Sequence, residues 1–544
     1  MLQSPPRYIL GALAAGHLLA AGASSQGEAS PGLTLYAPVS TASTHLMDST
    51  GQTLNTWPST STPGLSVYLL PNGNLLRAEH PPGAGSGPGG GPGGRVREID
   101  WEGNVLWSFD YFDFPVLHHH DIEPMPNGNV LMIAWEEFSN ASAVQAGRDP
   151  GTVGTSFYPD HIIEVQPTGA TSGTIVWEWH AWDHLIQDFD ATKDNFGVVA
   201  DHPELIDINY PPGFDSDWTH INSIDYNAEL DQILLSVHDL DEVWIIDHST
   251  TTAEAAGHTG GNSGKGGDLL YRWGNPEAYG AGTPADHILG GQHDANWVED
   301  GSPGAGNIVL FNNFSTAGPS VSSVVEFVPP VDEFGGYPLA PGQAFGPAGV
   351  LWEYTAPAPT SLFSPIMSGA IRLANGNTLV TSAVQGRIFE VTPDDEVVWE
   401  QTGLGTVFKA GHYARNLWSA DRTLSLSAGG DVQFDLVAGD VRAGDLYFVL
   451  GSVTGTEPAL PLGSIQLPLV FDPYFLLTLK GSAPLAGNLG VLDGQGKASF
   501  AFGLLPDTAP SLAGIVVHHS VLLADPDTFE FVHATNPESF ELVR

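Results

Sequence analysis

"LPNGNLLR", which runs from Leu70 to Arg77, returns as "MPNGNVLM" from Met125 and "LANGNTLV" from Leu373, with "GAGNIVLF" from Gly304 as a looser copy. The Asn-Gly pair favours a tight turn between two strands because both residues tolerate a positive φ, and the apolar run behind it is typical of a buried strand. A phrase that recurs in this way predicts a chain built from repeated β units.

A second phrase follows each copy of the first and reads as two outer strands with a turn between them. Its copies are "RVREIDWEGNVLWSF" from Arg95, "HIIEVQPTGATSGTIVWEW" from His161, "VWIIDHST" from Val243 with "LLYRWG" from Leu269, "SVVEFVPP" from Ser323 with "GVLWEY" from Gly349, and "RIFEVTPDDEVVWE" from Arg387. Each unit then holds about four short strands, which is the signature of a β-propeller blade. Five such units are visible, at about residues 64–110, 118–182, 218–273, 292–356 and 363–402.

The ring needs a further unit in order to close. "THLMDSTGQTLNTW" from Thr44 resembles an outer strand pair with no inner strands before it, and "GHYARNLW" from Gly411 resembles an inner strand with nothing after it. We therefore predict an all-β fold: a six-bladed β-propeller over residues 33–421, whose last blade is shared between the two ends of the propeller. Residues 422–544 lack both phrases and alternate apolar and polar residues between Gly and Pro turns, which predicts a C-terminal β-sandwich-like domain.

Residues 1–23 have the pattern of a signal peptide. Arg7 precedes an apolar run from Tyr8 to Ala23, which ends in the small residues Ala-Gly-Ala. The run is shorter than the roughly 20 residues of a membrane span, so we expect a cleaved signal, a secreted or periplasmic protein and no membrane span. The sequence contains no cysteine, which excludes disulfides and thiolate metal sites.

The charge balance is strongly acidic, with 17 Lys and Arg against 62 Asp and Glu and a formal net charge of −45. Such a field repels nucleic acids and anionic membranes, so we expect neither as a partner. A site for an anionic substrate must draw its positive charge and donors largely from the 20 histidines. Two glycine-rich runs, "PPGAGSGPGGGPGG" from Pro81 and "GHTGGNSGKGGD" from Gly257, read as loops, because the second lacks the Gly and Ser or Thr of a phosphate-binding motif.

Histidines stand where four of the predicted inner strands begin. They are His118, His119 and His120 before Asp121, His220 with Asn222 in "DWTHINSIDY", His293 with Asp294 in "QHDANW", and His412 in "GHYARN". Inner strands line the central channel of a propeller, so these side chains are expected to converge on its axis. Three interpretations stay open: polar residues that pack a wet channel, imidazoles that ligate a metal, or nucleophilic and electrostatic catalysis on an anion.

Four motifs in order, "HHHDIEPMPNGNVLM", "WEWHAWDHLIQDFD", "DWTHINSIDYNAELDQILLS" and "GQHDANW", resemble those of the bacterial arylsulfotransferases. The resemblance covers about residues 60–405 and not the C-terminal domain. It implies a secreted enzyme that moves a sulfuryl group from an aryl sulfate donor to a phenolic acceptor, both small molecules, without a nucleotide sulfate donor, a metal or another cofactor. It also implies that His293 carries the sulfuryl group, that His220 and Asn222 bind it, and that His120, or failing it His119, is the histidine of the His-His-Asp motif.

One position departs from the family pattern. The arginine expected eighteen residues after His220 is replaced by His238, which gives up a permanent charge and a bidentate donor. Weakened activity, a different donor and loss of activity all remain open. Nearby cations in the sequence are Arg272, Arg387, Lys409 and Arg415; we predict substrate contacts from Arg387, His119 and His412 and a catalytic place for His238.

Two other functional classes fit the same sequence. One is a non-catalytic propeller that binds a carbohydrate or a protein, and the other is a quinoprotein or metal-dependent oxidoreductase. If His293 attacks the donor it must be neutral, so an ordinary histidine pKa predicts that donor turnover falls as the pH drops through about 6.5. Asp294 is a poor candidate to orient His293, because adjacent residues on a strand face opposite sides. The identities of donor and acceptor and the oligomeric state stay open.

Overall fold

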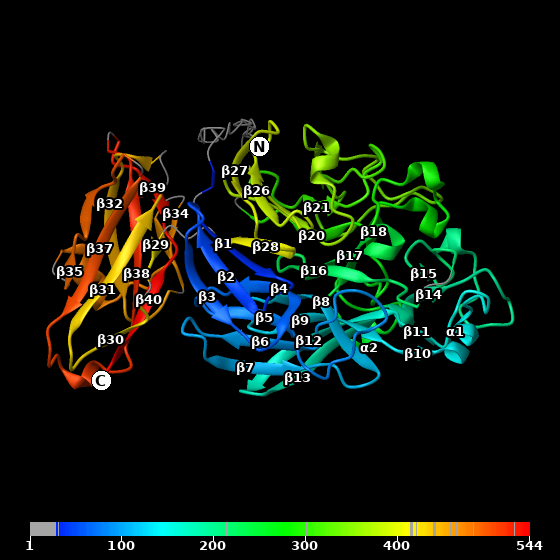
Figure 1. The fold of residues 1–544 in the computed structure, drawn as a ribbon, viewed down its shortest axis with the longest axis horizontal. Helices are drawn as coiled ribbons and strands as arrows, with labels where there is room; N and C mark the ends of the chain where they lie inside the picture. The colour runs from blue at the N-terminus through cyan, green and yellow to red at the C-terminus, as the bar shows by residue number, and fades with distance from the viewer. Residues whose placement is uncertain are drawn as a thin grey trace, which may run out of the picture.

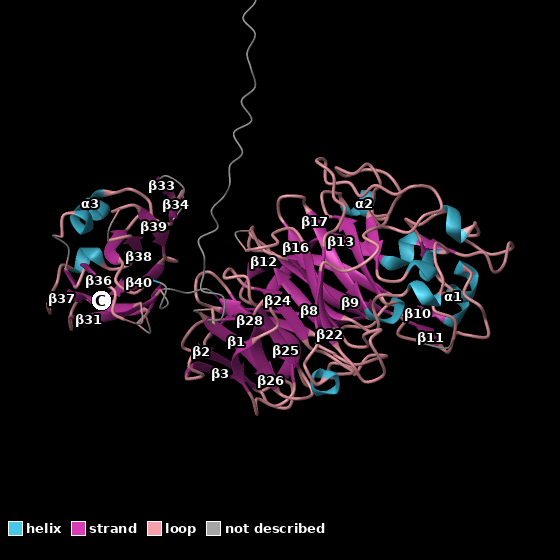
Figure 2. Cartoon of the chain, turned by 90° about the horizontal axis from the view of Figure 1, so that it is seen from above, coloured by secondary structure: helices cyan, strands magenta, loops and turns pink. Residues whose placement is uncertain are grey.

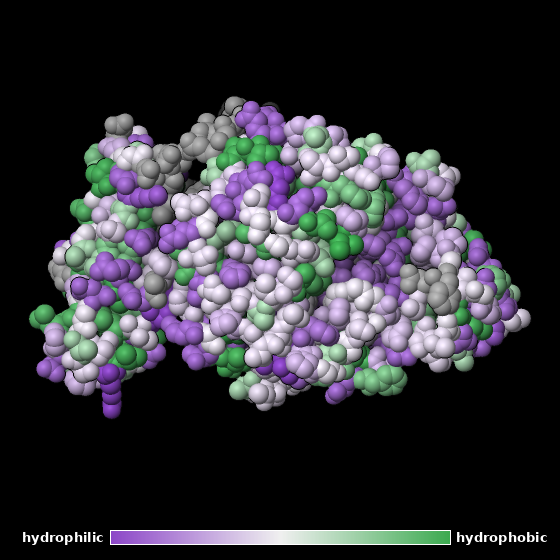
Figure 3. Space-filling model, in the orientation of Figure 1, coloured by the Kyte–Doolittle hydropathy of each residue, from purple (hydrophilic) through white to green (hydrophobic). Residues whose placement is uncertain are grey.

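The computed structural model describes residues 29–544 except 31, 214–215, 301, 414–416, 420, 439–441, 457, 463–464, 482–483, 495 and 527. The predicted signal peptide, residues 1–23, and Arg415 lie outside the described residues. Strands hold 43% of the chain and helices 9%, which confirms the predicted all-β class. None of the described helices is long and apolar enough to cross a membrane. Hydrophilic side chains spread over much of the face seen in Figure 3, with smaller hydrophobic patches between them.

Six four-stranded antiparallel sheets form the described chain between Leu33 and Tyr413. Five follow chain order from the inner to the outer strand. They are β4 (Thr62–Leu69), β5 (Leu75–His80), β6 (Arg95–Ile99) and β7 (Val105–Asp110); β8 (Val116–Pro124), β9 (Val130–Glu136), β12 (Asp160–Gly169) and β13 (Ser172–His180); β16 (Ile221–Asn227), β17 (Gln232–Val237), β18 (Glu242–Asp247) and β19 (Tyr271–Trp273); β20 (His293–Trp297), β21 (Ile308–Asn312), β22 (Ser323–Phe327) and β23 (Trp352–Tyr354); and β24 (Gly369–Arg372), β25 (Thr378–Ser382), β26 (Arg387–Val391) and β27 (Val397–Gln401).

The sixth sheet joins the two ends of this region, in the order β28 (Val407–Tyr413), β1 (Leu33–Pro38), β2 (Ser43–Asp48) and β3 (Thr53–Pro58). The sequence predicted that the two ends of the propeller share one sheet, but it did not predict how many strands each end contributes. The N-terminal part supplies three strands rather than an outer pair, and the inner strand begins at Val407 rather than Gly411. All six residues of β1 are buried, so it lacks the alternation that marks a strand in sequence.

The inner strands surround a common axis. Each of β4, β8, β16, β20, β24 and β28 contacts the next, and β28 returns to contact β4. Figure 1 shows β4, β8, β16, β20 and β28 grouped at the middle of this region, with β3, β7, β13 and β27 farther out. Apolar cores fill the spaces between successive sheets, for example Leu76 and Val96 of one sheet against Ile122 and Ile163 of the next. Each such fully buried side chain contributes about 1.5–3 kcal/mol.

The two recurring phrases are tied to each other by hydrogen bonds. The turn glycines Gly73, Gly128 and Gly376 have φ values of 86°, 84° and 92°, which explains the Asn-Gly pairs. The asparagines on either side donate to a glutamate on the third strand of the same sheet: Asn72 and Asn74 to Glu98, Asn127 and Asn129 to Glu164, and Asn375 and Asn377 to Glu390. The carboxylate therefore fixes the turn between the first two strands onto the third strand.

Short elements interrupt the sheets. Between β9 and β12 lie β10 (Phe138–Ser139), α1 (Asn140–Ala146) and β11 (Ser156–Phe157), and between β13 and β16 lie η1 (Ala181–His184), β14 (Leu185–Ile186), η2 (Val199–Asp201) and β15 (Ile206–Asp207). Further along are η3 (His238–Leu240), α2 (Thr252–Ala255), η4 (Pro276–Tyr279), η5 (Pro284–Asp286) and η6 (Pro359–Leu362). Of these, α1, β10 and β11 lie at the far side of the propeller from the C-terminal domain (Figure 2).

The C-terminal domain is made of two sheets that enclose their own core. One sheet has the order β29 (Leu417–Trp418), β31 (Gly430–Val437), β37 (Lys497–Leu504) and β35 (Leu485–Ala486). The other has the order β30 (Thr423–Ser425), β40 (Glu538–Val543), β38 (Val516–Ala524), β32 (Leu446–Ser452) and β36 (Leu489–Val491), with β39 (Phe531–Ala534) beside β38; β33 (Leu460–Leu462), β34 (Ile465–Leu467), α3 (Pro473–Leu479) and η8 (Pro510–Leu512) complete the domain. Because Leu417 is buried in this core, the domain begins a few residues before the predicted boundary at residue 422.

Removal of residues 30–58 should open the ring, because β28 would lose its partner β1 and the core around Leu35, Leu46 and Trp57 would be exposed. A single buried Leu→Ala change costs about 2–5 kcal/mol, so losing this set exceeds the roughly 5–15 kcal/mol stability of a typical domain. Thermal unfolding of the truncated chain, compared with a chain that begins at Ala29, measures the effect. An unchanged transition would contradict the closure by β1.

Candidate active site

Four imidazoles form a continuous row where the inner strands β8, β16 and β20 begin. The ring centroids of His120 and His220 are 4.7 Å apart, those of His220 and His238 are 5.0 Å apart, and those of His238 and His293 are 5.3 Å apart. Asn222 lies beside the row and donates from Nδ2 to the carbonyl of Gln292 at 2.8 Å. The structure thus brings together five residues that the sequence placed in one site.

The backbone is irregular where these strands begin. His120, His220 and Asp294 have φ values of 54°, 47° and 57°, in the left-handed region that residues other than glycine rarely adopt. The pairing register of each inner strand shifts at the same place, between His118 and Ile122 in β8, Ile221 and Ser223 in β16, and His293 and Asn296 in β20. Bulges of this kind re-aim side chains, and strain of this kind concentrates at functional sites.

His293 is held in one tautomer. Its Nδ1 lies 2.9 Å from Asn313 Oδ1 and 3.1 Å from the carbonyl of Gly291. The amide nitrogen of Asn313 donates to the carbonyls of Ser364 and Met367, at 2.8 and 2.9 Å, so its Oδ1 must face the imidazole and accept. Nδ1 of His293 therefore carries the proton, and the lone pair of Nε2 accepts a hydrogen bond from the Met367 N–H at 3.2 Å.

The electrostatic surroundings keep His293 neutral. Burial lowers its pKa well below the ordinary 6.5, and the neighbouring His238 and His220 lower it further. Asp294 does not orient this ring, because its carboxylate accepts from the Ala370 N–H at 3.1 Å and pairs with Lys409. The orienting residue is Asn313, which lies just beyond β21 and which the sequence motifs did not single out.

His220, unlike His293, is positively charged. Its Nδ1 lies 2.6 Å from Asp217 Oδ2, and the other oxygen of Asp217 accepts from the indole of Trp135 at 2.6 Å. Burial opposes protonation, but the hydrogen bond and charge of Asp217 outweigh it and, with Asp239 and Asp160, raise the pKa of His220 to about 9. His220 is therefore an imidazolium at neutral pH.

His119 lies behind His120 and positions it. Its Nε2 donates to Asp160 at 2.7 Å, and its ring stacks on Trp135 with centroids 3.8 Å apart. The Nδ1 atoms of the two histidines are 2.7 Å apart. Burial and the neighbouring histidines, His220 first among them, lower the pKa of His120 well below 6.5, so a neutral His120 donates to His119 and keeps a lone pair on Nε2.

His238, at the position of the expected arginine, stands in the middle of the row. Its Nδ1 lies 2.5 Å from Asp239 Oδ1, which leaves one ring nitrogen for a ligand. Lys409, a predicted candidate for a compensating cation, pairs instead with Asp121 at 2.7 Å and Asp294 at 3.1 Å. Burial alone would lower the pKa of Lys409, but these two carboxylates raise it, so the amine stays charged within its own ion pair.

Two predicted substrate contacts lie elsewhere. His412 is at the opposite end of β28 and lines the other mouth of the channel, a cavity of about 1390 Å³ that also contains Glu123 and Asp225. The residue of β28 that faces the histidine row is Phe408, whose ring centroid lies 6.0 Å from that of His120 and 6.3 Å from that of His293. The earlier start of β28 explains the shift.

Arg387 is likewise outside the row. It lies on β26, the third strand of its sheet, where it pairs with Glu400 at 2.7 Å and its guanidinium sits 3.8 Å from the centroid of the Phe389 ring. Arg272 is also committed elsewhere, because it forms a buried ion pair with Glu242. Neither arginine takes the place of the guanidinium expected at position 238.

Comparison with known proteins gives the family. Residues 23–402 match the sequence model of the arylsulfotransferase family, Arylsulfotransferase (ASST). The chain belongs to this family. Membership implies a sulfotransferase enzyme that acts on small molecules. No curated protein matches the sequence.

Solved structures with similar folds are distant. A protein of unknown function from Bacteroides caccae has 11% identity and a TM-score of 0.38, with 70% of this chain and 98% of that chain covered. A streptogramin B lyase has 12% identity and a TM-score of 0.34, with 70% and 84% covered. Virginiamycin B lyase from Staphylococcus aureus has 10% identity and a TM-score of 0.33, with 69% and 84% covered. At such low identity and TM-score, these structures do not indicate the function of this arylsulfotransferase-family chain.

The glycine-rich run from Pro81 closes over the histidine row. The backbone N–H of His120 donates to the Gly91 carbonyl at 2.9 Å, and the Gly93 N–H donates to the His118 carbonyl at 2.9 Å. A Cβ on Gly91 would lie 2.4 Å from His120 Nε2, and one on Gly89 would lie 1.9 Å from Asp217 Oδ2. The sequence suggested only a loop, whereas its glycines allow the backbone to lie directly against the site.

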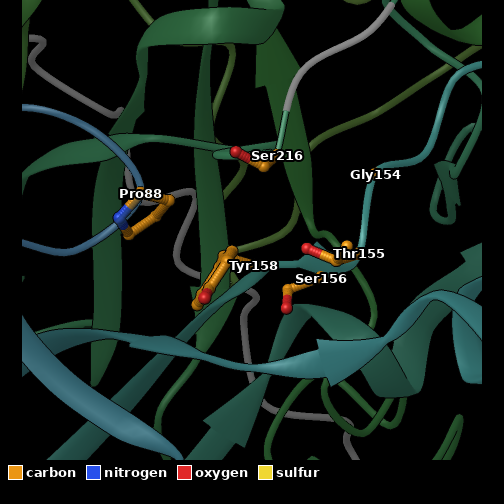
Figure 4. A pocket seen from close by; sticks show the side chains of 6 residues that line it. All are labelled: Pro88, Gly154, Thr155, Ser156, Tyr158 and Ser216. Carbon is orange, nitrogen blue, oxygen red and sulfur yellow. The ribbon is translucent and has the colours of Figure 1, made fainter.

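A polar pocket of about 260 Å³ adjoins this loop. Figure 4 shows Pro88 on one side and Thr155 and Ser156 on the other, with Tyr158 and Ser216 between them. Pro88 immediately precedes Gly89, and Ser216 immediately precedes Asp217, so the pocket lies beside two residues that pack near His220, although no histidine of the row lines it. Tyr158 was not anticipated, because nothing in its local sequence marks it as part of a site.

Gly91→Ala should disturb the site, because Gly91 has a φ of 77° and the added methyl group would meet His120. We expect a loss of about 1–3 kcal/mol in the free energy of unfolding and displaced NMR signals of the His120 ring. Gly90→Ala is the matched control, because its Cβ would meet no atom within 4 Å. Equal behaviour of the two variants would contradict the close packing of this loop on His120.

Proposed function

We propose that the chain is an exported sulfotransferase that moves a sulfuryl group from an aryl sulfate ester to a phenolic acceptor through a sulfurylated His293, without a nucleotide sulfate donor. The observation that carries the proposal is the pairing of a neutral imidazole, oriented by Asn313, with the imidazolium of His220 in one row. The first supplies a nucleophile and the second stabilises negative charge.

In the first half-reaction, Nε2 of His293 gives up the hydrogen bond it accepts from the Met367 N–H and attacks the sulfur of the donor. A bond forms between nitrogen and sulfur, the bond between sulfur and the aryl oxygen breaks, and the electron pair leaves with the phenoxide. Because Nδ1–H of His220 is held by Asp217, its Nε2–H is left to donate to a sulfuryl oxygen or to the departing phenoxide. A donor of this kind is worth roughly 10²- to 10³-fold in rate.

In the second half-reaction, a phenolic acceptor attacks the same sulfur and the bond to His293 breaks. His220 gives its Nε2 proton to the departing phenoxide in the first half-reaction and takes the acceptor's proton in the second, so protons balance over the cycle and the imidazolium is restored. His120 lies beside His220, but its pKa is held well below 6.5, which makes it a weak base.

The pocket beside Pro88 suits the aromatic part of the donor. Tyr158 offers a ring surface, and the Ser and Thr hydroxyls offer hydrogen bonds. Because the loop of residues 81–94 lies against His120 and Asp217, we infer that it must shift before a sulfate ester reaches His293. Replacement of the expected arginine by His238 removes a bidentate contact, which favours weak donor binding.

A non-catalytic binding protein is the second candidate, and two observations favour it: the missing arginine and the closed loop over the row. A sulfotransferase transfers the sulfuryl group and forms the adduct on His293, whereas a non-catalytic binding protein does neither.

His293→Ala should abolish phenol release from a chromogenic aryl sulfate, and wild-type protein mixed briefly with this donor should gain the mass of one sulfuryl group, stable in alkali and labile in acid. Stopped reactions followed by mass spectrometry measure the adduct. His202→Ala serves as the control, because that histidine is exposed and pairs with Glu204 away from the row. Full activity in His293→Ala, or no adduct on an active wild type, would refute the proposed intermediate.

The pH profile of the first half-reaction should be set by two shifted histidines. The pKa of His293 lies well below 6.5, so its neutral form persists to lower pH than an ordinary histidine would allow, and the fall expected near 6.5 from sequence moves to more acidic pH. The pKa of His220 lies near 9, so its N–H donor is present below that pH and is lost as the pH rises through it. Phenol release in single turnovers, which needs no acceptor, measures both limits.

Asp217→Asn provides the matching variant for the alkaline limit. Without the carboxylate, the pKa of His220 falls, and the alkaline limb of the profile should move to lower pH by more than about one unit. An alkaline limb that stays near 9 in this variant would show that another group controls it.

A further inference from the structure

A second cluster of metal-ligating side chains lies at the outer strands and involves none of the histidines in the row. His184 ends η1, directly after β13, while His258 and Asp268 lie in the glycine-rich run between α2 and β19. One ligand atom from each residue lies within 4.8 Å of the other two. The sequence interpretation of "GHTGGNSGKGGD" as a plain loop left this arrangement unassigned.

The hydrogen bonds of His184 are those of a metal ligand. Its side chain is fully buried, and its Nε2 lies 2.8 Å from the carbonyl of Ala255, which can only accept. Nε2 therefore carries a proton, and Nδ1 is left to face the carboxylate of Asp268 at 2.9 Å. A histidine that donates one nitrogen to a backbone carbonyl and turns the other to a shared centre is the usual arrangement around a bound ion.

The imidazole of His184 is also fixed from behind. The ring of Trp179 stacks on it with an interplanar angle of 6° and centroids 5.7 Å apart. The Trp179 indole donates to the carbonyl of Gly267 at 2.7 Å, which holds the loop on the ring. A Cβ on Gly267 would lie 2.7 Å from His184 Nε2, so only glycine allows this approach.

The third ligand completes a set of two nitrogens and one oxygen. His258 Nδ1 lies 2.7 Å from the same Asp268 oxygen that faces His184. Ligands held about 2.0–2.2 Å from one ion in a tetrahedron lie about 3.3–3.6 Å apart. The two distances to the Asp268 oxygen, 2.9 and 2.7 Å, must therefore lengthen by a few tenths of an ångström when an ion enters, and the two nitrogens lie within 4.8 Å of each other. His258 is 61% exposed, so the remaining coordination positions open to solvent.

We propose that His184, His258 and Asp268 bind one divalent transition-metal ion of the Zn²⁺ type, with water at the open positions. Two imidazoles select such an ion over Mg²⁺ and Ca²⁺, which prefer oxygen ligands alone. An ion bound there links the loop of residues 257–268 to the residues that follow β13. It thereby connects the sheet that ends in β13 with the sheet that ends in β19. The role is structural and independent of sulfuryl transfer.

Another cluster, Glu136, His161 and His180, is less suited to an ion. Nε2 of His161 is taken by the hydroxyl of Tyr111 at 2.9 Å, and His180 lies between two carboxylates, Glu136 at 2.9 Å and Glu178 at 3.4 Å. Burial opposes protonation, but these carboxylates raise the pKa of His180, so a charged histidine balances their charge, while Nδ1 of His161 stays buried without a hydrogen-bond partner among the described residues. This cluster supplies the control variant.

The test uses the full chain after dialysis against a chelator. Titration calorimetry with Zn²⁺ should find one site in the wild type, Mg²⁺ should not compete for it, and saturating Zn²⁺ should raise the thermal transition. His258→Ala removes an exposed side chain and should weaken Zn²⁺ binding by roughly tenfold or more and abolish the thermal shift. His180→Ala should leave both unchanged.

Absence of Zn²⁺ binding by the wild type, undiminished binding by His258→Ala, or loss of binding in His180→Ala would each overturn the proposal. Asp268→Asn adds an independent check, because it keeps the shape of the loop residue and removes the charge that the ion needs. Retention of full affinity in this variant would likewise count against the site.

Discussion

The pairing of β1 with β28 is the constraint on which the rest depends. Leu35 and Tyr36 of β1 pair with Gly411 and Ala410 of β28, and this contact converts a row of sheets into a closed ring. The histidine row draws on β8, β16 and β20, with Phe408 of β28 facing it. Each of these strands belongs to a different sheet, so the distances between their side chains are fixed only when the ring is closed. The geometry of the histidine row at the axis thus depends on the pairing of β1 with β28, which joins the first and last strands of the propeller.

Much of the fold could be predicted from sequence because its signals are local. The Asn-Gly turns and the pairs of outer strands lie within single units, and each repeat reinforces the others. β1 could not be predicted, since all six of its residues are buried and its partner stands at the other end of the propeller. His412 was misplaced for a related reason: a Gly-His pair resembles the start of an inner strand, but β28 begins at Val407 and puts Phe408 at the site instead.

The candidate site shows the same division. His120, His220 and His293 were found because each stands at the start of a predicted inner strand, and His238 because it takes the place of the arginine that the family resemblance implies. Their partners were not found, because the pairing of Asp217 with His220, of Asp160 with His119 and of Asn313 with His293 depends on three-dimensional contacts that the motifs do not specify. Sequence therefore indicated which imidazoles meet, whereas the structure determines which of them is charged. The ordinary pKa expected for His293 is wrong because the ring is buried, and the sequence does not reveal that burial.

Net charge makes this arrangement of protonation states necessary. A chain with a formal charge of −45 has few cations to spare: Lys409 of the inner strand β28 is already paired with Asp121, and Arg272 of the outer strand β19 is paired with Glu242. A positive charge for an anionic substrate must then come from a histidine whose pKa is raised, which requires a carboxylate beside it. That same carboxylate would repel an anionic ligand, and in the described structure the backbone of Gly89 lies directly against it, because a Cβ there would be only 1.9 Å from Asp217 Oδ2. The charge of His220 and the glycine composition of the loop are therefore linked through one residue, Asp217.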